Sequence, residues 1–105
     1  MPPEGESGFV AVLVIDLHFP DAASLKGKRK ELSSIKAQLR TRLGVAVAEV
    51  DHQDLWQRAR LTAALTGGSL PVLAAAADSV ERWLEARWPD NVRIQRIVTS
   101  VEDLT

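Results

Sequence analysis

Four basic side chains lie at the start of a segment with helical periodicity: Lys26, Lys28, Arg29 and Lys30. Helix N-termini carry a partial positive charge, so they favour Asp and Glu and repel cations. A bound phosphate would reverse this repulsion, because free N–H groups and cationic side chains would then share one anion. From the residues alone, a solvated basic face is the commoner case, and a phosphate-binding surface is the alternative.

A near-neutral total hides this basic segment. The chain has 13 Lys and Arg against 14 Asp and Glu, a formal net charge of −1. Residues 26–42 contain seven basic residues and one acid, so they carry +6 and the rest of the chain carries −7. The total excludes a uniformly basic nucleic-acid binder, but not a local basic patch.

A second group of functional side chains lies in the stretch EVDHQDLWQR, residues 49–58. Trp56 offers a flat ring for stacking on a base. His52, Gln53 and Arg58 offer hydrogen-bond donors to phosphates or base edges. The stretch is therefore a candidate for a second RNA contact. The alternative is a turn held by aspartate side chains, with its apolar residues folded onto the core.

Other chemistries find little support. Asp51, His52 and Asp54 have atoms suited to a divalent cation, but no distant fourth ligand completes the set, so we expect no metal and no cofactor. The chain has no cysteine and so no thiol nucleophile. An acid–base pair of His52 with an aspartate would have no neighbouring nucleophile or pocket. The expectation is that the protein is not an enzyme.

Six predicted elements position these two segments. Apolar residues with helical spacing, preceded by Ser24 or Ser69 as possible N-caps, indicate two helices. Alternating or continuous β-branched runs indicate four strands. The expected ranges are strands at 9–19, 45–51, 58–66 and 92–101 and helices at 24–43 and 70–87. This β-α-β-β-α-β order predicts a ferredoxin-like α+β fold, a four-stranded antiparallel sheet with both helices on one face.

The predicted topology brings the two segments together. The basic helix start follows the first strand, and the stretch 49–58 follows the second strand. These two strands are parallel in this fold, so both segments should lie at one end of the sheet. An apolar sheet face away from the helices would instead favour a protein-interaction or homodimerisation module. The residues expected on that face are Val10, Val12, Val14, Val45 and Val47.

Length and composition set the remaining expectations. The 105 residues correspond to one domain, expected at 9–101 after a disordered tail at 1–8. Hydrophobic residues make up 46%, which is enough for a packed core. No apolar run approaches the roughly 18 residues of a transmembrane helix, and the acidic start MPPEGESG lacks the basic region of a secretory signal. We expect a cytoplasmic protein without membrane contact.

Residues 24–59, SLKGKRKELSSIKAQLRTRLGVAVAEVDHQDLWQRA, resemble the core of the YlxP-like family of small uncharacterised bacterial proteins. The family pattern is similar to S-L-K-x-K-R, here at 24–29, and to V-[AS]-E-V-x-x-x-D-L-W-Q-R, here at 47–58. The first strand also fits, and the resemblance covers 9–101. Gly27 departs from the pattern, since a charged residue such as Glu is commoner there.

The resemblance implies a ferredoxin-like fold but no established activity. Genes of the family often lie beside those of a translation initiation factor and a ribosome-binding maturation factor, which implies a role linked to the ribosome or to RNA. The leading expectation is a small cytoplasmic accessory protein that binds ribosomal RNA or the small ribosomal subunit. The expected phosphate and RNA contacts are Lys26, Lys28, Arg29, Lys30, His52, Gln53, Trp56 and Arg58.

Overall fold

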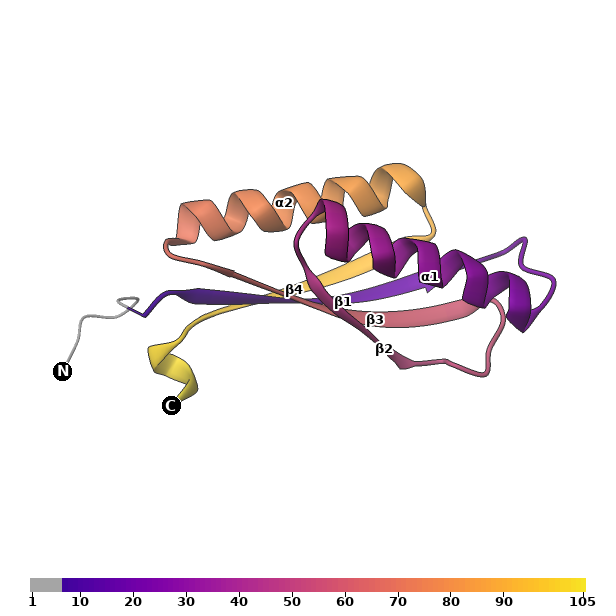
Figure 1. Ribbon diagram of the computed structural model, residues 1–105, viewed down its shortest axis with the longest axis horizontal. Helices are drawn as coiled ribbons and strands as arrows, with labels where there is room; N and C mark the ends of the chain where they lie inside the picture. Colours follow the sequence, from indigo (N-terminus) through magenta and orange to yellow (C-terminus); the bar gives the residue numbers. More distant parts are fainter. Residues whose placement is uncertain (1–6) are drawn as a thin grey trace.

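The six elements follow one another in the predicted order in the computed structural model, which describes residues 7–105 (Figure 1). They are β1 (Phe9–His18), α1 (Leu25–Arg42), β2 (Ala46–Asp51), β3 (Arg58–Gly67), α2 (Leu70–Arg87) and β4 (Val92–Ser100), followed by a 3-10 turn, η1 (Glu102–Leu104). The element boundaries lie within one residue of those predicted from the sequence.

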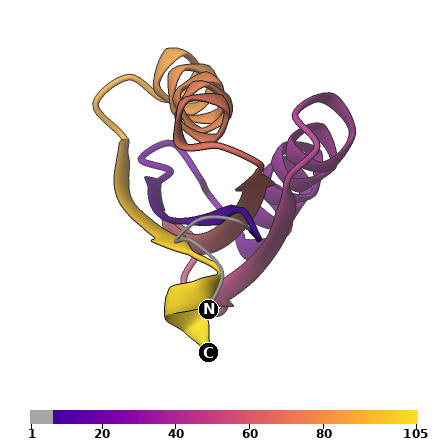
Figure 2. The ribbon, with the colours of Figure 1, turned by 90° about the vertical axis from the view of Figure 1, so that its left-hand side faces the viewer.

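The four strands form one sheet in the order β2-β3-β1-β4, and each neighbouring pair is antiparallel. β1 and β2 are both antiparallel to β3, so they run parallel to each other. Both helices cover the same face of the sheet (Figure 2). The ferredoxin-like α+β fold predicted from the element order is therefore confirmed.

The core lies between the sheet and the two helices. Alternate residues of β1 point into it, and Leu13 and Ile15 have no exposed surface. The helices contribute side chains at a spacing of three or four residues, the signature of a helix with one buried face. Those of α1 are Leu32, Ile35 and Leu39, and those of α2 are Leu73, Ala77, Val80 and Leu84. Full burial of each large side chain contributes about 1.5–3 kcal/mol.

Capping residues define the ends of the helices. The Ser24 hydroxyl accepts a hydrogen bond from the Gly27 N–H at 3.1 Å, and Ser69 accepts one from Val72 at 3.4 Å. Each bond satisfies an N–H group that has no partner within its helix. Gly44 follows α1 with φ of +65°, a left-handed conformation that favours glycine.

Residues 1–6 of the predicted disordered tail lie outside the described part of the chain. Gly8, the last residue of that tail, is buried, and its carbonyl accepts a hydrogen bond from the Val101 N–H at 3.0 Å. Residue 8 therefore belongs to the fold. No helix within residues 7–105 is long and apolar enough to cross a membrane.

The sheet face away from the helices, called here the open face, differs from the prediction at β2. Val45 and Val47 were expected on it, but both are buried on the helix side. The smaller Ala46 and Ala48 take the open positions, because the larger side chains gain more from burial against α1. Val10, Val12 and Val14 of β1 do lie on the open face and are half-buried.

Candidate functional site

Three connections of the chain lie at one end of the molecule, called here the basic end (Figure 1). They join β1 to α1, β2 to β3 and α2 to β4. Backbone hydrogen bonds tie them together: the His18 N–H donates to the Asn91 carbonyl at 2.9 Å, and the Phe19 N–H donates to the Gln57 carbonyl at 2.8 Å. The sheet therefore brings both segments singled out in the sequence to this end, as the predicted topology requires.

Lys28 joins those two segments directly. Its side chain has no exposed surface, and its ammonium group donates to the carbonyl of His52 at 2.6 Å and to that of Leu55. The Glu49 carboxylate lies 3.9 Å away. Burial lowers the pKa of Lys28, and Glu49 acts in the opposite direction. Lys28 therefore holds the β2–β3 connection against the first turn of α1 and presents no charge to a ligand.

The other three cations at the start of α1 are exposed. These are Lys26, Arg29 and Lys30, and none of them forms an ion pair within residues 7–105. The first turn contains no acidic residue. The helix dipole and the three unpaired cations therefore both make the electrostatic potential at the start of α1 positive.

The β2–β3 connection, residues 52–57, exposes the side chain of Trp56 to solvent. Trp56 keeps 50% of its surface exposed and Leu55 keeps 49%, so neither is folded onto the core. His52 has φ of +62°, and its N–H is held by the Asp51 carboxylate at 2.8 Å. The Leu55 N–H donates to the His52 carbonyl at 3.0 Å. This local turn keeps the Trp56 ring half in solvent.

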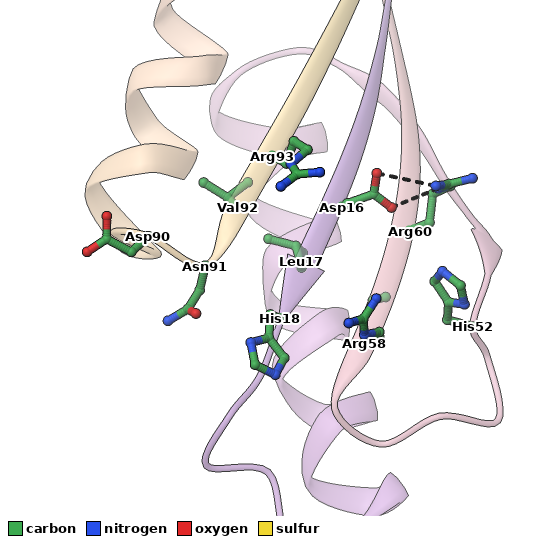
Figure 3. A pocket seen from close by; sticks show the side chains of 11 residues that line it. Asp16, Leu17, His18, His52, Arg58, Arg60, Asp90, Asn91, Val92 and Arg93 are labelled. Atoms are coloured by element: carbon green, nitrogen blue, oxygen red, sulfur yellow. Dashed lines mark hydrogen bonds and ion pairs between the residues drawn. The ribbon is translucent and has the colours of Figure 1, made fainter.

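A hollow of about 400 Å³ opens on the other side of the basic end, on the open face (Figure 3). Three arginines line it, Arg58 and Arg60 from β3 and Arg93 from β4. Asp16 of β1 lies between two of them in the register, opposite Arg60 on one side and Arg93 on the other. The Arg60 Nε–H donates to Asp16 at 2.8 Å, and this bond raises the pKa of Arg60.

The structure thus divides the predicted site residues between two surfaces. Lys26, Arg29 and Lys30 lie in the helix layer. Arg58 and His52 line the hollow on the open face, and α1 lies behind the sheet in that view (Figure 3). Gln53 and Trp56 lie on the connection between the two surfaces and are exposed. Lys28 belongs to neither surface.

Within residues 7–105, no three His, Asp or Glu side chains lie close enough together to hold a metal ion. Asp51 and His52 are neighbours, with 3.9 Å between carboxylate and ring nitrogen, but Asp54 does not complete a group with them.

Of the residues that line the hollow, only His52 and Arg58 were among the predicted site residues; the groups that the prediction missed include Asp16, His18, Arg60 and Arg93. Strand alternation does place Arg58 and Arg60 on the face opposite Leu61, and Asp16 and His18 on the face opposite Leu17. Only the pairing register shows that these groups and Arg93 lie in two neighbouring rows across the sheet, and the sequence does not fix that register.

Comparisons with known proteins are consistent with this architecture. Residues 10–98 match the model of a family described as a protein of unknown function, DUF503. The chain belongs to the DUF503 family. No curated protein matches it. The solved structure of the de novo designed protein Foldit4 is similar, with a TM-score of 0.58 at 10% sequence identity over 88% of this chain and 96% of that one. At that identity the likeness extends to the fold alone.

Proposed function

We propose that this DUF503 protein is a cytoplasmic, YlxP-like accessory protein that binds structured RNA of the small ribosomal subunit through its basic end. The observation that carries the proposal is the meeting of the two segments at that end. Three exposed, unpaired cations at the start of α1 lie beside a connection that exposes Trp56, and the buried Lys28 holds the two together. Each segment alone is also compatible with a solvated surface.

Contact with phosphates, rather than stacking on the sheet, is the mode of binding that the side chains favour. Apart from the His18 imidazole at its end, the open face carries no aromatic ring in the described part of the chain, since the odd-numbered position of Phe9 points to the helix side with Ala11 and Leu13. Base readout by a sheet requires such rings. Cations and one exposed ring suit the backbone and an unpaired base of a folded RNA.

The test removes the three exposed cations together, in the variant K26A/R29A/K30A, and measures affinity for small-subunit ribosomal RNA across a salt series. We expect affinity to fall at least tenfold at low salt. The slope of log K against log salt should flatten by about 0.7–0.9 for each phosphate that the variant no longer neutralises.

The matched control is K36A/R42A/R82A, which removes the same charge from the helices away from the basic end. It should retain most of the affinity and the original slope. Equal reductions in both triple variants would show a non-specific attraction to total charge and would contradict the proposal. Unchanged affinity in the first variant would contradict it as well.

An interaction module is the second candidate, because part of the open face is apolar. Ile97 of β4 is 48% exposed and lies opposite the half-buried Val12. A second copy of the chain or another protein would cover this surface. Sedimentation equilibrium separates the candidates: self-association that persists at high salt supports this one, whereas salt-sensitive RNA binding by a single chain supports the first.

A further inference from the structure

The hollow on the open face has cationic groups that the fold leaves without partners. Arg60 is occupied by Asp16, to which it donates at 2.8 Å and 3.4 Å. Arg58 and Arg93 form no ion pair within residues 7–105. Asp90 also borders the hollow, but its carboxylate points away from the arginines (Figure 3). The unpaired charges that face into the hollow are therefore positive.

The sheet register arranges these groups in rows across the strands. One row contains Asp51, Arg60, Asp16 and Arg93, from β2, β3, β1 and β4. The next row toward the end of the molecule pairs His18 with Arg58. Because the two free arginines lie on either side of β1, a tetrahedral anion above β1 can receive donors from both sides.

The next row of the open face, outside the hollow and toward the middle of the sheet, has a different character. Thr62, Val14 and Gln95 lie opposite one another on β3, β1 and β4, on the same open face. Val14 is half-buried and Gln95 is exposed. A flat ring lying over Val14 would meet an apolar surface, with a hydroxyl on one side and an amide on the other to bond its polar edges.

We propose that this hollow and the neighbouring row of the open face form a nucleotide site, in which Arg58 and Arg93 bind the phosphate and the nucleoside lies over Val14 between Thr62 and Gln95. Asp16 is a positioning residue: it accepts the Arg60 Nε–H at 2.8 Å and so holds the Arg60 guanidinium beside the phosphate position. The site is separate from the exposed cations of α1, which lie on the helix side. It does not rest on RNA binding by that surface.

The experiment titrates the intact protein, labelled with ¹⁵N, with adenosine 5′-monophosphate, with inorganic phosphate and with adenosine. We expect saturable shifts at the amides of 14–18, 58–62 and 93–95 with the monophosphate. Phosphate alone should bind the arginines several-fold more weakly, and adenosine more weakly still. An RNA oligonucleotide that displaces the monophosphate assigns the site to RNA, whereas one that does not assigns it to a free nucleotide.

Variants give the decisive comparison. R93A and R58A should each lower monophosphate affinity about tenfold or more, because each removes a charge-assisted hydrogen bond. Gln95→Ala should lower the affinity for the monophosphate but not for inorganic phosphate. R82A, on an exposed helix position, is the matched control.

Shifts confined to the start of α1, no saturation with any probe, or equal affinity in R93A and R82A would overturn the nucleotide site. Abolished monophosphate binding in K26A/R29A/K30A would overturn the separation of the two surfaces. The titrations with monophosphate, phosphate and adenosine need no RNA, so a failure of ribosomal RNA binding would not change their outcome.

Discussion

Single residues decide how the basic end is built, and Lys28 is the clearest case. Replacing it with Met removes the donor to the carbonyls of His52 and Leu55. The His52 carbonyl keeps its hydrogen bond from the Leu55 N–H, but the Leu55 carbonyl loses its donor, and an unsatisfied group of this kind costs about 1–3 kcal/mol of the free energy of unfolding. Amide hydrogen exchange in 52–57 should also accelerate. Lys26→Met is the control, with an expected change within about 0.5 kcal/mol because Lys26 is exposed.

The pH dependence of stability provides a second measurement on the same variant. Burial lowers the pKa of Lys28 below 10.5, so between the two pKa values the unfolded chain binds more protons than the folded chain. The contribution of Lys28 to the free energy of unfolding therefore rises with pH across that interval. Urea unfolding from neutral pH to pH 10.5 should show that the free energy of unfolding of the native protein rises relative to that of K28M. A flat difference would contradict the buried ammonium.

Trp56 allows packing and binding to be separated. With half of its surface exposed, its replacement by Leu should change the melting temperature little. If the ring stacks on a base, affinity for ribosomal RNA falls by about 1–3 kcal/mol. A decrease of a few kcal/mol in stability with unchanged binding per folded molecule would instead show that Trp56 is a packing anchor.

Lys28 also shows what residue types and spacing can each predict about a side chain. It stands among four basic residues, and that composition suggested a phosphate contact. Its spacing carried the contrary signal, because Lys28 lies four residues before Leu32 and shares the buried face with Ile35 and Leu39. A long lysine can bury its stem and still reach carbonyl groups, which composition does not show.

At the scale of the elements, the residue at position 27 in the first turn of α1 affects both the stability of the helix and the positive charge at its start. Gly27 is its third residue, and an added Cβ would meet only the Ser24 hydroxyl, at 3.4 Å. Gly27→Ala should therefore stabilise the helix by about 0.5–1 kcal/mol without changing RNA affinity. Gly27→Glu adds a capping box with Ser24 and should stabilise at least as much, but weaken RNA binding.

Thermal unfolding and RNA titration of both variants provide the measurement. A Gly27→Glu protein that binds RNA as well as Gly27→Ala would contradict a phosphate contact at the start of α1. The two substitutions occupy the same position, so the charge is the main difference between them.

The elements themselves were largely predictable, because local signals agreed with the global fold. Ser24, Ser69 and Gly44 mark helix ends, and alternation in β3 separates Ala59 and Leu61 from the arginines. β2 was harder, since VAVAEV is apolar on both faces over its first residues. There only side-chain size distinguishes the faces, and the packing against α1 selects the valines.

At the scale of the whole molecule, one acidic segment lies far from the exposed cations of α1. The molecule measures 54 × 25 × 23 Å, and the acidic η1, with Glu102 and Asp103, lies at the end opposite the start of α1 (Figure 1). Physiological salt screens exposed charges beyond about 8 Å. The near-neutral total charge therefore does not cancel the local potential of the basic end.

The apolar half of the open face gives a prediction at this scale. Ile97→Asp places a charge on the exposed part of that half without touching the basic end. We expect affinity for ribosomal RNA to stay within twofold of the native protein. A large drop in RNA binding, together with a change in sedimentation from dimer to monomer, would show that self-association is required for binding.

The central claim is that the basic end binds the small ribosomal subunit through phosphates. Its most direct test is cosedimentation of the native protein and K26A/R29A/K30A with isolated ribosomal subunits across a salt series. We expect the native protein to sediment with the small subunit at low salt and to be released as salt rises. The variant should be released at lower salt and with a flatter dependence. Equal cosedimentation of both proteins at every salt concentration, or none with the native protein, would contradict the claim.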